Sequence, residues 1–249
     1  MSRPQAPGDS EEIRRIRDVY DYLENSEDEQ AKWHLSNPGR VLMQKERRSV
    51  VEGILRQAGR LPGPETQILD VGCGRGAELS AMKDLGARET NLWGIDLLTH
   101  RVEKAGVLLP AAHLQTGSAE HIDAPTGAFD LVMLFTVMSS IRDEPMRRRI
   151  VGEITRVLKP RTADSTGGAV LWYDMRLPNP WNRHNLPLSR QDVARLFRGF
   201  DLELQSTTLL PPLARRLGRA SDLMYPLLAS MPALRSHLCG LLFPPSVSR

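Results

Sequence analysis

The sequence predicts a doubly wound α/β fold, in which helices cover both faces of a mostly parallel β-sheet. Three observations support this fold class. The 249 residues are 41% hydrophobic and 25% charged, which is ordinary for a globular chain. Short apolar runs alternate with amphipathic helical segments from residue 67 onward. A glycine-rich loop follows the first apolar run and opens a helix, as at the ligand-binding edge of such sheets.

Two helices are predicted before this alternation begins. Residues 11–23 and 41–58 repeat apolar side chains at the three- and four-residue spacing of an amphipathic helix. A connector rich in proline and glycine follows the second helix. We therefore divide the chain into an N-terminal helical lid or cap at 1–60 and a main domain at 61–249.

Seven segments of the main domain are predicted to be strands. Helical segments separate most of the first five, and this alternation predicts right-handed crossovers between parallel neighbours. The strands are expected at QILDV, NLWGID, AAHLQTG, FDLVMLF, GAVLWYD, DLELQSTTLL and HLCGLLF.

Composition excludes several classes of protein. Two cysteines, Cys73 and Cys239, cannot form a disulfide framework and suggest a reducing compartment. No stretch of about 20 apolar residues is present, and the first residues lack the apolar core of a secretion signal. We expect a cytoplasmic protein with no membrane partner. A net charge of +3 disfavours a nucleic-acid partner, and no C-x-x-C or H-x-x-x-H spacing indicates a metal site.

The segment ILDVGCGRG carries the strongest functional signal. Gly72, Gly74 and Gly76 form a G-x-G-x-G pattern, which differs from the G-x-G-x-x-G fingerprint of pyrophosphate-binding loops. Asp70 precedes the first glycine; its charge disfavours a phosphate and suits an ammonium group. The loop therefore favours a ligand that carries an amino group.

A second acid refines this ligand. Asp96 closes the next predicted strand about 20 residues further on, where an acid accepts hydrogen bonds from ribose hydroxyls. A nucleoside that carries an amino acid and no phosphate fits both Asp70 and Asp96. S-adenosylmethionine is such a molecule.

The segments ILDVGCGRG, GIDLL, GSAEHI, FDLVMLFTV and RVLKP…GGAVLWYD, in this order, resemble the class I, Rossmann-like S-adenosylmethionine-dependent methyltransferases over residues 67–174. The flanking segments are similar to bacterial small-molecule methyltransferases that act on sugars and natural products. The resemblance implies a seven-stranded sheet with an antiparallel last strand and S-adenosylmethionine as cofactor. It implies methyl transfer to an O or N atom of a glycoside, polysaccharide precursor or natural product.

The resemblance also assigns the parts of the cofactor to residues. Asp70 and the glycine loop take the methionine part, Asp96 takes the ribose, and residues 118–120 border the adenine. Phe135 and Thr136 line the floor near the sulfonium. The full set of cofactor-binding residues is Asp70, Gly72, Cys73, Gly74, Gly76, Asp96, Leu97, Ser118, Ala119, Glu120, Phe135 and Thr136.

Charged and titratable residues outside this set have candidate roles. Arg40 or Arg75 is a candidate partner for the methionine carboxylate, because an arginine can bind it through two parallel hydrogen bonds. A hydroxyl acceptor also needs a base. Asp174, which closes the fifth strand, and His184, in the loop after it, are the candidate bases.

An insert at 211–235 separates the last two predicted strands and is too long for a hairpin loop. We expect it to fold over the carboxyl edge of the sheet, bury its apolar positions and wall the acceptor pocket, with Pro226 and Pro232 breaking its helices. Its arginines suit an anionic acceptor, and a homodimer contact is the alternative. The apolar positions are Leu213, Leu217, Leu223, Met224, Leu227 and Leu228, and the arginines are Arg215, Arg216 and Arg219.

Two other functions stay open. An RNA or protein methyltransferase would need a basic face or an added recognition domain, and the chain shows neither clearly. A non-catalytic subunit that binds the cofactor is the third reading, because the motifs report binding and not turnover.

Overall fold

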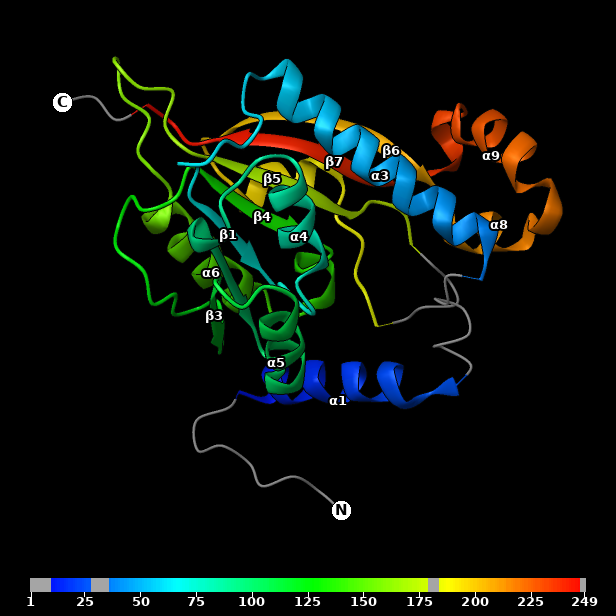
Figure 1. Ribbon diagram of the computed structural model, residues 1–249, viewed down its shortest axis with the longest axis horizontal. Helices are drawn as coiled ribbons and strands as arrows, with labels where there is room; N and C mark the ends of the chain where they lie inside the picture. Colours follow the sequence, from blue (N-terminus) through cyan, green and yellow to red (C-terminus); the bar gives the residue numbers. More distant parts are fainter. Residues whose placement is uncertain (1–9, 28–35, 179–183, 247–249) are drawn as a thin grey trace.

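A seven-stranded β-sheet forms the centre of the computed structural model, which describes residues 10–27, 36–178 and 184–246 (Figure 1). The strand order is β3-β2-β1-β4-β5-β7-β6, so the predicted α/β sheet is confirmed. The strands are β1 (Ile68–Val71), β2 (Leu92–Asp96), β3 (His113–Thr116), β4 (Leu131–Phe135), β5 (Ala169–Met175), β6 (Asp201–Leu209) and β7 (Arg235–Phe243).

The directions of the strands bring the candidate functional residues to one edge of the sheet. The first five strands are parallel, and β7 runs antiparallel to both β5 and β6. His237, near the start of β7, therefore pairs with Met175 at the end of β5 and with Thr207 near the end of β6. The carboxyl edge of the parallel strands thus also holds the β6–β7 end of the sheet.

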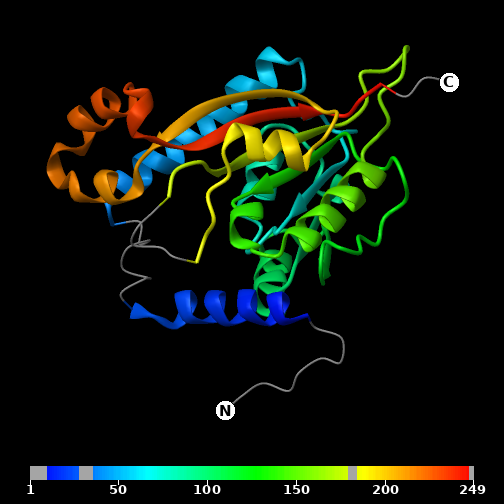
Figure 2. The ribbon, with the colours of Figure 1, turned by 180° about the vertical axis from the view of Figure 1, so that it is seen from behind.

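Helices cover both faces, as the alternation predicts. Helices α3 (Pro38–Gln57) and α4 (Ala77–Asp84) pack on one face, and α6 (Glu144–Val157) and α7 (Arg190–Leu196) on the other (Figure 2). Helix α5 (Thr99–Leu108) packs beside β2 and β3. Short 3-10 helices occupy η1 (Glu89–Asn91), η2 (Met138–Ser140), η3 (Gly218–Ala220) and η4 (Pro232–Leu234).

Helix α1 (Glu11–Asn25) lies on the opposite side of the molecule from α3 (Figure 1). The Ser10 side chain accepts a hydrogen bond from the Ile13 amide and so caps the helix. Ile13 and Ile16 are buried in the same apolar cluster as α6. The apolar face seen in the sequence is therefore the face that docks α1.

Helix α3 begins three residues earlier than the sequence pattern predicts. The Asn37 side chain accepts a hydrogen bond from the Arg40 amide, and Pro38 takes the first helical position, where its missing N–H costs nothing. Gly39 packs against helix α8, because a Cβ there would lie 1.9 Å from the Ala214 carbonyl oxygen.

The insert forms helices α8 (Pro211–Arg216) and α9 (Ser221–Ala229), which project beyond the sheet and pack against α3 (Figure 1). Tyr225 and Ala214 are buried there together with Met43. Part of the expectation for this segment is wrong, since Leu223 is 78% exposed and Leu227 is 61% exposed. These two leucines lie four residues apart, on a different face of α9 from Tyr225.

Pro226 also departs from the prediction, because it lies inside α9 and does not break it. It stands only one and a half turns from the helix start, where few intrahelical hydrogen bonds are lost. The other proline, Pro232, opens η4 as a helix breaker would.

Candidate functional site

The glycine loop lies between the end of β1 and the start of α4. Gly72 has φ 75° and Gly76 has φ 81°, backbone conformations that residues with a Cβ rarely adopt. A Cβ on Gly72 would also lie 2.6 Å from a methyl group of Val137. The amides of Gly72 and Cys73 donate to the Ile95 carbonyl at 2.8 and 3.1 Å, which holds the loop against β2.

Cys73 fills space beneath this loop. It is buried, and a Cβ on Gly94 would lie only 2.8 Å from its sulfur. Burial, and then the charges of Asp70 and Asp96, raise the pKa of the thiol. The thiol is therefore an inert packing group.

Asp96 organises the loop from the neighbouring strand. Its carboxylate oxygens accept hydrogen bonds from the amides of Gly74 and Leu98, each at 2.9 Å. A carboxylate offers about four lone-pair positions, so two remain for other donors. Beside it, the Leu97 carbonyl accepts a hydrogen bond from Arg17 at 3.4 Å.

Asp70 is the most unusual group at this edge. It is 2% exposed, and its Oδ1 has no hydrogen-bond partner in the part of the chain that the structure describes. Burial raises its pKa well above the ordinary value of 3.8, and the charges of Glu78 and Asp96 raise it further. A buried carboxyl group without a partner is costly unless a ligand supplies one. A positively charged amino group fits this position.

Arg47 of α3 lies over the next part of the edge. Its guanidinium pairs with Glu78 and lies 5.9 Å from the Phe135 ring centroid and 5.4 Å from that of Tyr173. Arg40, two turns earlier on α3, makes no ion pair with a described residue, and burial together with the charge of Arg47 lowers its pKa. The two arginines make this side of the edge suitable for an anionic group.

The residues after β4 form a tight turn. Thr136 has φ 56°, and its amide donates to the Tyr173 carbonyl at 2.7 Å. The Phe135 ring stacks on Tyr173 with centroids 5.7 Å apart. Together these contacts hold the turn after β4 against β5, and Val137 of this turn lies next to Gly72 of the glycine loop.

The predicted adenine segment follows β3. The Gly117 amide donates to the Asp96 carbonyl at 2.9 Å, which brings the segment beside the predicted ribose residue. The Ser118 hydroxyl donates to Glu120 at 3.1 Å, and Glu120 also pairs with Arg149. Ala119 packs against the apolar core.

The two candidate bases differ in environment. Asp174 is 1% exposed, and its carboxylate accepts hydrogen bonds from the amides of Ser139 and Met175. Burial raises its pKa to about 6 against these hydrogen bonds. These contacts make Asp174 a support for η2. His184 is half-buried in the loop before α7, and the base role of both residues stays a prediction.

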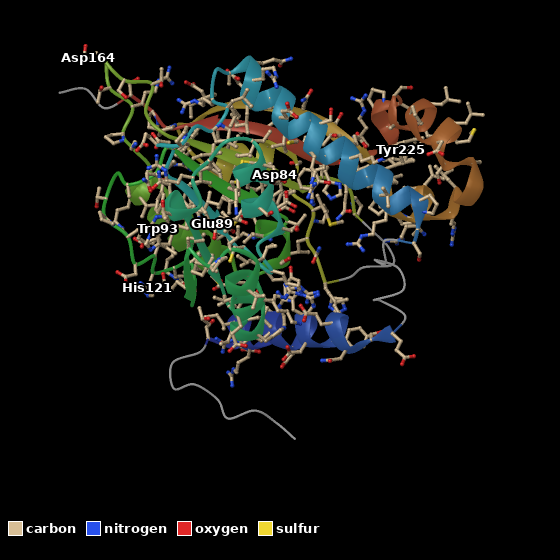
Figure 3. All side chains as sticks on the ribbon, in the orientation of Figure 1. Asp84, Glu89, Trp93, His121, Asp164 and Tyr225 are labelled. Carbon is tan, nitrogen blue, oxygen red and sulfur yellow. The ribbon has the colours of Figure 1, made fainter. Side chains whose placement is uncertain are left out.

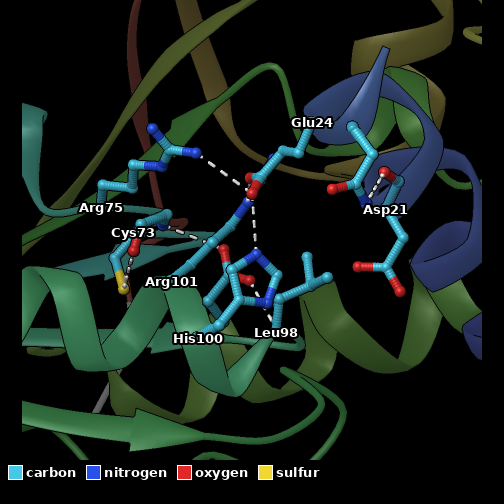
Figure 4. A network of polar contacts seen from close by, with 10 residues as sticks. Asp21, Glu24, Cys73, Arg75, Leu98, His100 and Arg101 are labelled. Carbon is cyan, nitrogen blue, oxygen red and sulfur yellow. Dashed lines mark hydrogen bonds and ion pairs between the residues drawn. The ribbon is translucent and has the colours of Figure 1, made fainter. Parts of the chain in front are cut away.

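Helix α1 closes over the glycine loop through Glu24, which the sequence analysis did not single out (Figure 4). Glu24 accepts from His100 at 2.8 Å, pairs with Arg101, and lies 3.1 Å from Arg75 of the glycine loop. Burial opposes ionisation, yet hydrogen bonds from His100 and the charge of Arg101 lower the Glu24 pKa to about 2. Glu24 lies near the C-terminus of α1, where a negative charge is unfavourable in an isolated helix. This position was the one feature of the sequence that indicated a positively charged partner elsewhere in the fold.

The described residues contain neither a metal-binding cluster nor a membrane-spanning helix. Within the described ranges, no group of three or more His, Cys, Asp or Glu residues is arranged to hold a metal ion. None of the described helices is both long and apolar enough to span a membrane.

Comparison with known proteins adds to this geometry. Residues 68–161 match the family model described as a methyltransferase domain. The ubiquinone biosynthesis O-methyltransferase of Sodalis glossinidius (strain morsitans) is 37% identical over 134 residues, 51% of this chain and 48% of that protein. The chain therefore spans about half the length of the curated relative it matches.

Solved structures share the fold. A SAM-dependent methyltransferase from Methanosarcina mazei has a TM-score of 0.53 and 14% identity, covering 77% of this chain and 98% of its own. One from Archaeoglobus fulgidus has a TM-score of 0.55 and 13% identity, covering 82% and 97%. The [4+2]-cyclase SpnF has a TM-score of 0.56 and 17% identity, covering 80% and 81%. The fold is therefore that of class I SAM-dependent methyltransferases.

Proposed function

We propose that this chain is an S-adenosylmethionine-dependent methyltransferase that acts on an O or N atom of a small molecule. The buried carboxyl of Asp70, whose Oδ1 has no hydrogen-bond partner among the described residues, carries the proposal, because it precedes the glycine loop within the segment that matches a methyltransferase domain. An ammonium group on the ligand would supply the partner that this carboxyl lacks.

The described residues fit the remaining parts of the cofactor. Asp96 has free lone pairs for ribose hydroxyls beyond those engaged by the loop. Arg40 is the candidate partner for the methionine carboxylate, because Arg75 is engaged by Glu24. Residues 118–120 border the adenine, and Phe135 with Thr136 forms the floor near the sulfonium.

When bound, the cofactor supplies a methyl group on a positively charged sulfur, a centre open to displacement by a lone pair. The chain's own contribution is to position the acceptor and exclude water, and positioning alone accounts for several kcal/mol of barrier reduction in well-oriented reactions. Helix α1 serves as the lid over this site. Asp174 and His184 are the candidates for a base.

A small-molecule acceptor is supported by the relative from Sodalis glossinidius, whose name describes an O-methyltransferase of ubiquinone biosynthesis. Insert arginines such as Arg215 and Arg216 support an anionic acceptor such as a glycoside phosphate or carboxylate. The free cysteines Cys73 and Cys239 support a reducing compartment, and we place the protein in the cytoplasm.

Isothermal titration of the full chain tests the proposal. We expect micromolar-range binding of S-adenosylmethionine and of its demethylated product S-adenosylhomocysteine, and no binding of NAD. Heat from NAD together with none from the two S-adenosyl compounds would overturn the assignment. Binding without methyl transfer to any acceptor would leave the non-catalytic subunit as the function.

A further inference from the structure

His237 lies at the edge of the sheet that holds the candidate site, although nothing in the sequence marked it. Since β7 runs antiparallel to β5, the pairing of His237 with Met175 places it at the carboxyl edge. Its ring is 7% exposed and stacks on Tyr173 with centroids 4.6 Å apart and an interplanar angle of 12°. Tyr173 in turn stacks on Phe135, so three rings extend from the floor of the candidate cofactor site toward β7.

Ser236 has one hydroxyl proton for two neighbouring acceptors, the Thr208 carbonyl and His237 Nδ1, and its direction sets the tautomer of His237. The Ser236 hydroxyl donates its single proton to the Thr208 carbonyl at 3.1 Å. His237 Nδ1 lies 2.8 Å from the same hydroxyl, and while the Ser236 proton points to Thr208 this contact requires a hydrogen on Nδ1. In this tautomer the lone pair of the neutral ring is on Nε2, which has no hydrogen-bond partner among the residues described.

A buried scaffold holds the Thr208 carbonyl in place. Thr208 has φ 62°, strained for a β-branched residue, and its amide donates to Glu46 at 2.9 Å. Tyr225 of the insert donates to the same carboxylate at 2.5 Å, from its position between α9 and α3 (Figure 3). The Thr208 hydroxyl also lies 2.9 Å from the Tyr173 hydroxyl. Three elements thus fix the backbone that orients Ser236.

The groups around His237 keep it neutral. Burial and the positive charge of Arg47 on α3 lower its pKa to about 3. The other titratable groups nearby are Glu46 on α3, which is hydrogen-bonded to Tyr225 and Thr208, and Tyr173, whose own pKa burial raises. At neutral pH the imidazole ring of His237 is thus uncharged and has one unprotonated nitrogen.

We propose that His237 Nε2 accepts the proton of an acceptor hydroxyl, so that the methyl group goes to oxygen on a flat, hydroxylated ring. This inference rests on the proposed function and names its acceptor class. The hydroxyl oxygen bonds to the methyl carbon, the carbon–sulfur bond breaks with its electron pair left on sulfur, and the hydroxyl proton passes to Nε2. The proton then leaves to water, which restores the neutral ring.

A weakly basic nitrogen suffices for this role. The acceptor oxygen becomes strongly acidic only as its bond to the methyl carbon forms, so proton transfer follows bond formation. The ring row of Phe135, Tyr173 and His237 favours a planar acceptor, because aromatic rings stack at such spacings.

Nitrogen-15 NMR of the histidine rings in the full chain tests the tautomer. We expect His237 to show a protonated Nδ1 and an unprotonated Nε2 from pH 8 to pH 5. Catechol, added in the presence of S-adenosylhomocysteine, should shift the Nε2 signal. A protonated Nε2 at neutral pH, or an Nε2 signal that catechol does not move, would overturn the proposal.

Methylation of catechol by two variants supplies the second test. His237→Phe keeps a stacked ring without the nitrogens and should lower kcat by about 100-fold, the lower range for loss of a general base. Its affinity for S-adenosylhomocysteine should stay at the wild-type value. His113→Phe is the matched control, since His113 is also a stacked histidine, on Trp93 in β3, and it should keep wild-type kcat.

These measurements separate the inference from the proposed function. If the wild-type protein fails to bind S-adenosylhomocysteine, the methyltransferase assignment fails. If it binds this compound but His237→Phe keeps wild-type kcat with catechol, only the role of His237 fails. Methylation of aniline in place of catechol would also refute the oxygen acceptor.

Discussion

At the scale of single residues, the Asp70 carboxyl is costly to the free protein because it is buried and its Oδ1 has no partner among the described residues. Its folded-state pKa lies above the ordinary value of 3.8, so the folded state binds this proton more tightly than the unfolded state. The protonated carboxyl therefore stabilises the folded state, and this stabilisation is lost as the pH rises from about 4 through the raised pKa. The same carboxyl is the group that a ligand ammonium would neutralise.

Asp70→Asn should therefore stabilise the free protein and abolish cofactor binding. At pH 7.5 we expect the free energy of unfolding to rise, because the amide of asparagine needs no ionisation in the buried site. Calorimetry measures the first effect and titration with S-adenosylhomocysteine the second. In the wild-type protein, affinity for this compound should rise with pH, because binding requires the ionised carboxyl. A variant that is less stable at pH 7.5 yet still binds would contradict this account.

Asp96 combines two roles, because the carboxylate that we assign to the ribose also receives the Gly74 and Leu98 amides. Asp96→Ala should weaken S-adenosylmethionine binding by about 1.5–3 kcal/mol, the range for hydrogen bonds to a charged group. Titration measures this, with Asp84→Ala as control, since Asp84 is an exposed acid at the far end of α4 (Figure 3). Equal affinities of the two variants for S-adenosylmethionine would show that a residue other than Asp96 contacts the ribose.

At the scale of elements, α1 is held by polar anchors at both of its ends. Near its start, Glu12 accepts from Arg15 and from the amide of Arg142. Near its end, Glu24 pairs with His100, Arg101 and Arg75. Both glutamates have pKa values lowered to about 2. Each glutamate is therefore ionised at neutral pH. The stability that its ionised form contributes to the fold is lost as the pH falls from about 4.5 toward 2.

Glu24→Gln should loosen α1 without unfolding the sheet. Loss of the charge leaves Arg101 and His100 without their carboxylate, which weakens the docking of α1 by about 1–3 kcal/mol. Hydrogen exchange should show faster exchange in α1 alone, and S-adenosylhomocysteine should dissociate faster. Asp18→Asn, an exposed acid on the same helix, is the control and should change neither rate. Exchange in α1 as slow as in the wild type would show that its apolar face alone holds it.

At the scale of the whole molecule, the candidate site draws residues from elements on both sides of one edge of the sheet. Helix α1 contributes Glu24, α3 contributes Arg40 and Arg47, and the insert supports β6 and β7 through Tyr225. A ligand bound there contacts several elements at once. It should therefore stabilise the native state as a unit.

Saturating S-adenosylhomocysteine should raise the melting temperature of the full chain in one transition. At a ligand concentration about 100 times Kd, the gain is about 2.7 kcal/mol. For a chain of this length this corresponds to a rise of roughly 5–11 °C. Calorimetry measures it, and NAD at the same concentration should cause no shift. A transition that splits in two with ligand would show that the cap and the sheet do not melt together.

The sequence by itself determined the sheet and the glycine loop. Strand and helix periodicities are local, so the alternation from β1 to β5 was readable without tertiary information. The glycine loop and the acids Asp70 and Asp96 were readable for the same reason, because each lies at the end of a recognisable strand. The length of the insert was also visible, as was its helical spacing.

Tertiary structure alone decided which distant residues meet and which side of each helix faces water. Glu24 reaches Arg75 and Arg101 only because α1 docks across the edge of the sheet. His237 gains its environment from an antiparallel strand that brings it beside Tyr173 and Ser236. Leu223 has the spacing of a core position but is exposed, because no element packs on that side of α9 in the described chain. Periodicity predicts that a face exists, and only packing between distant segments determines what covers it.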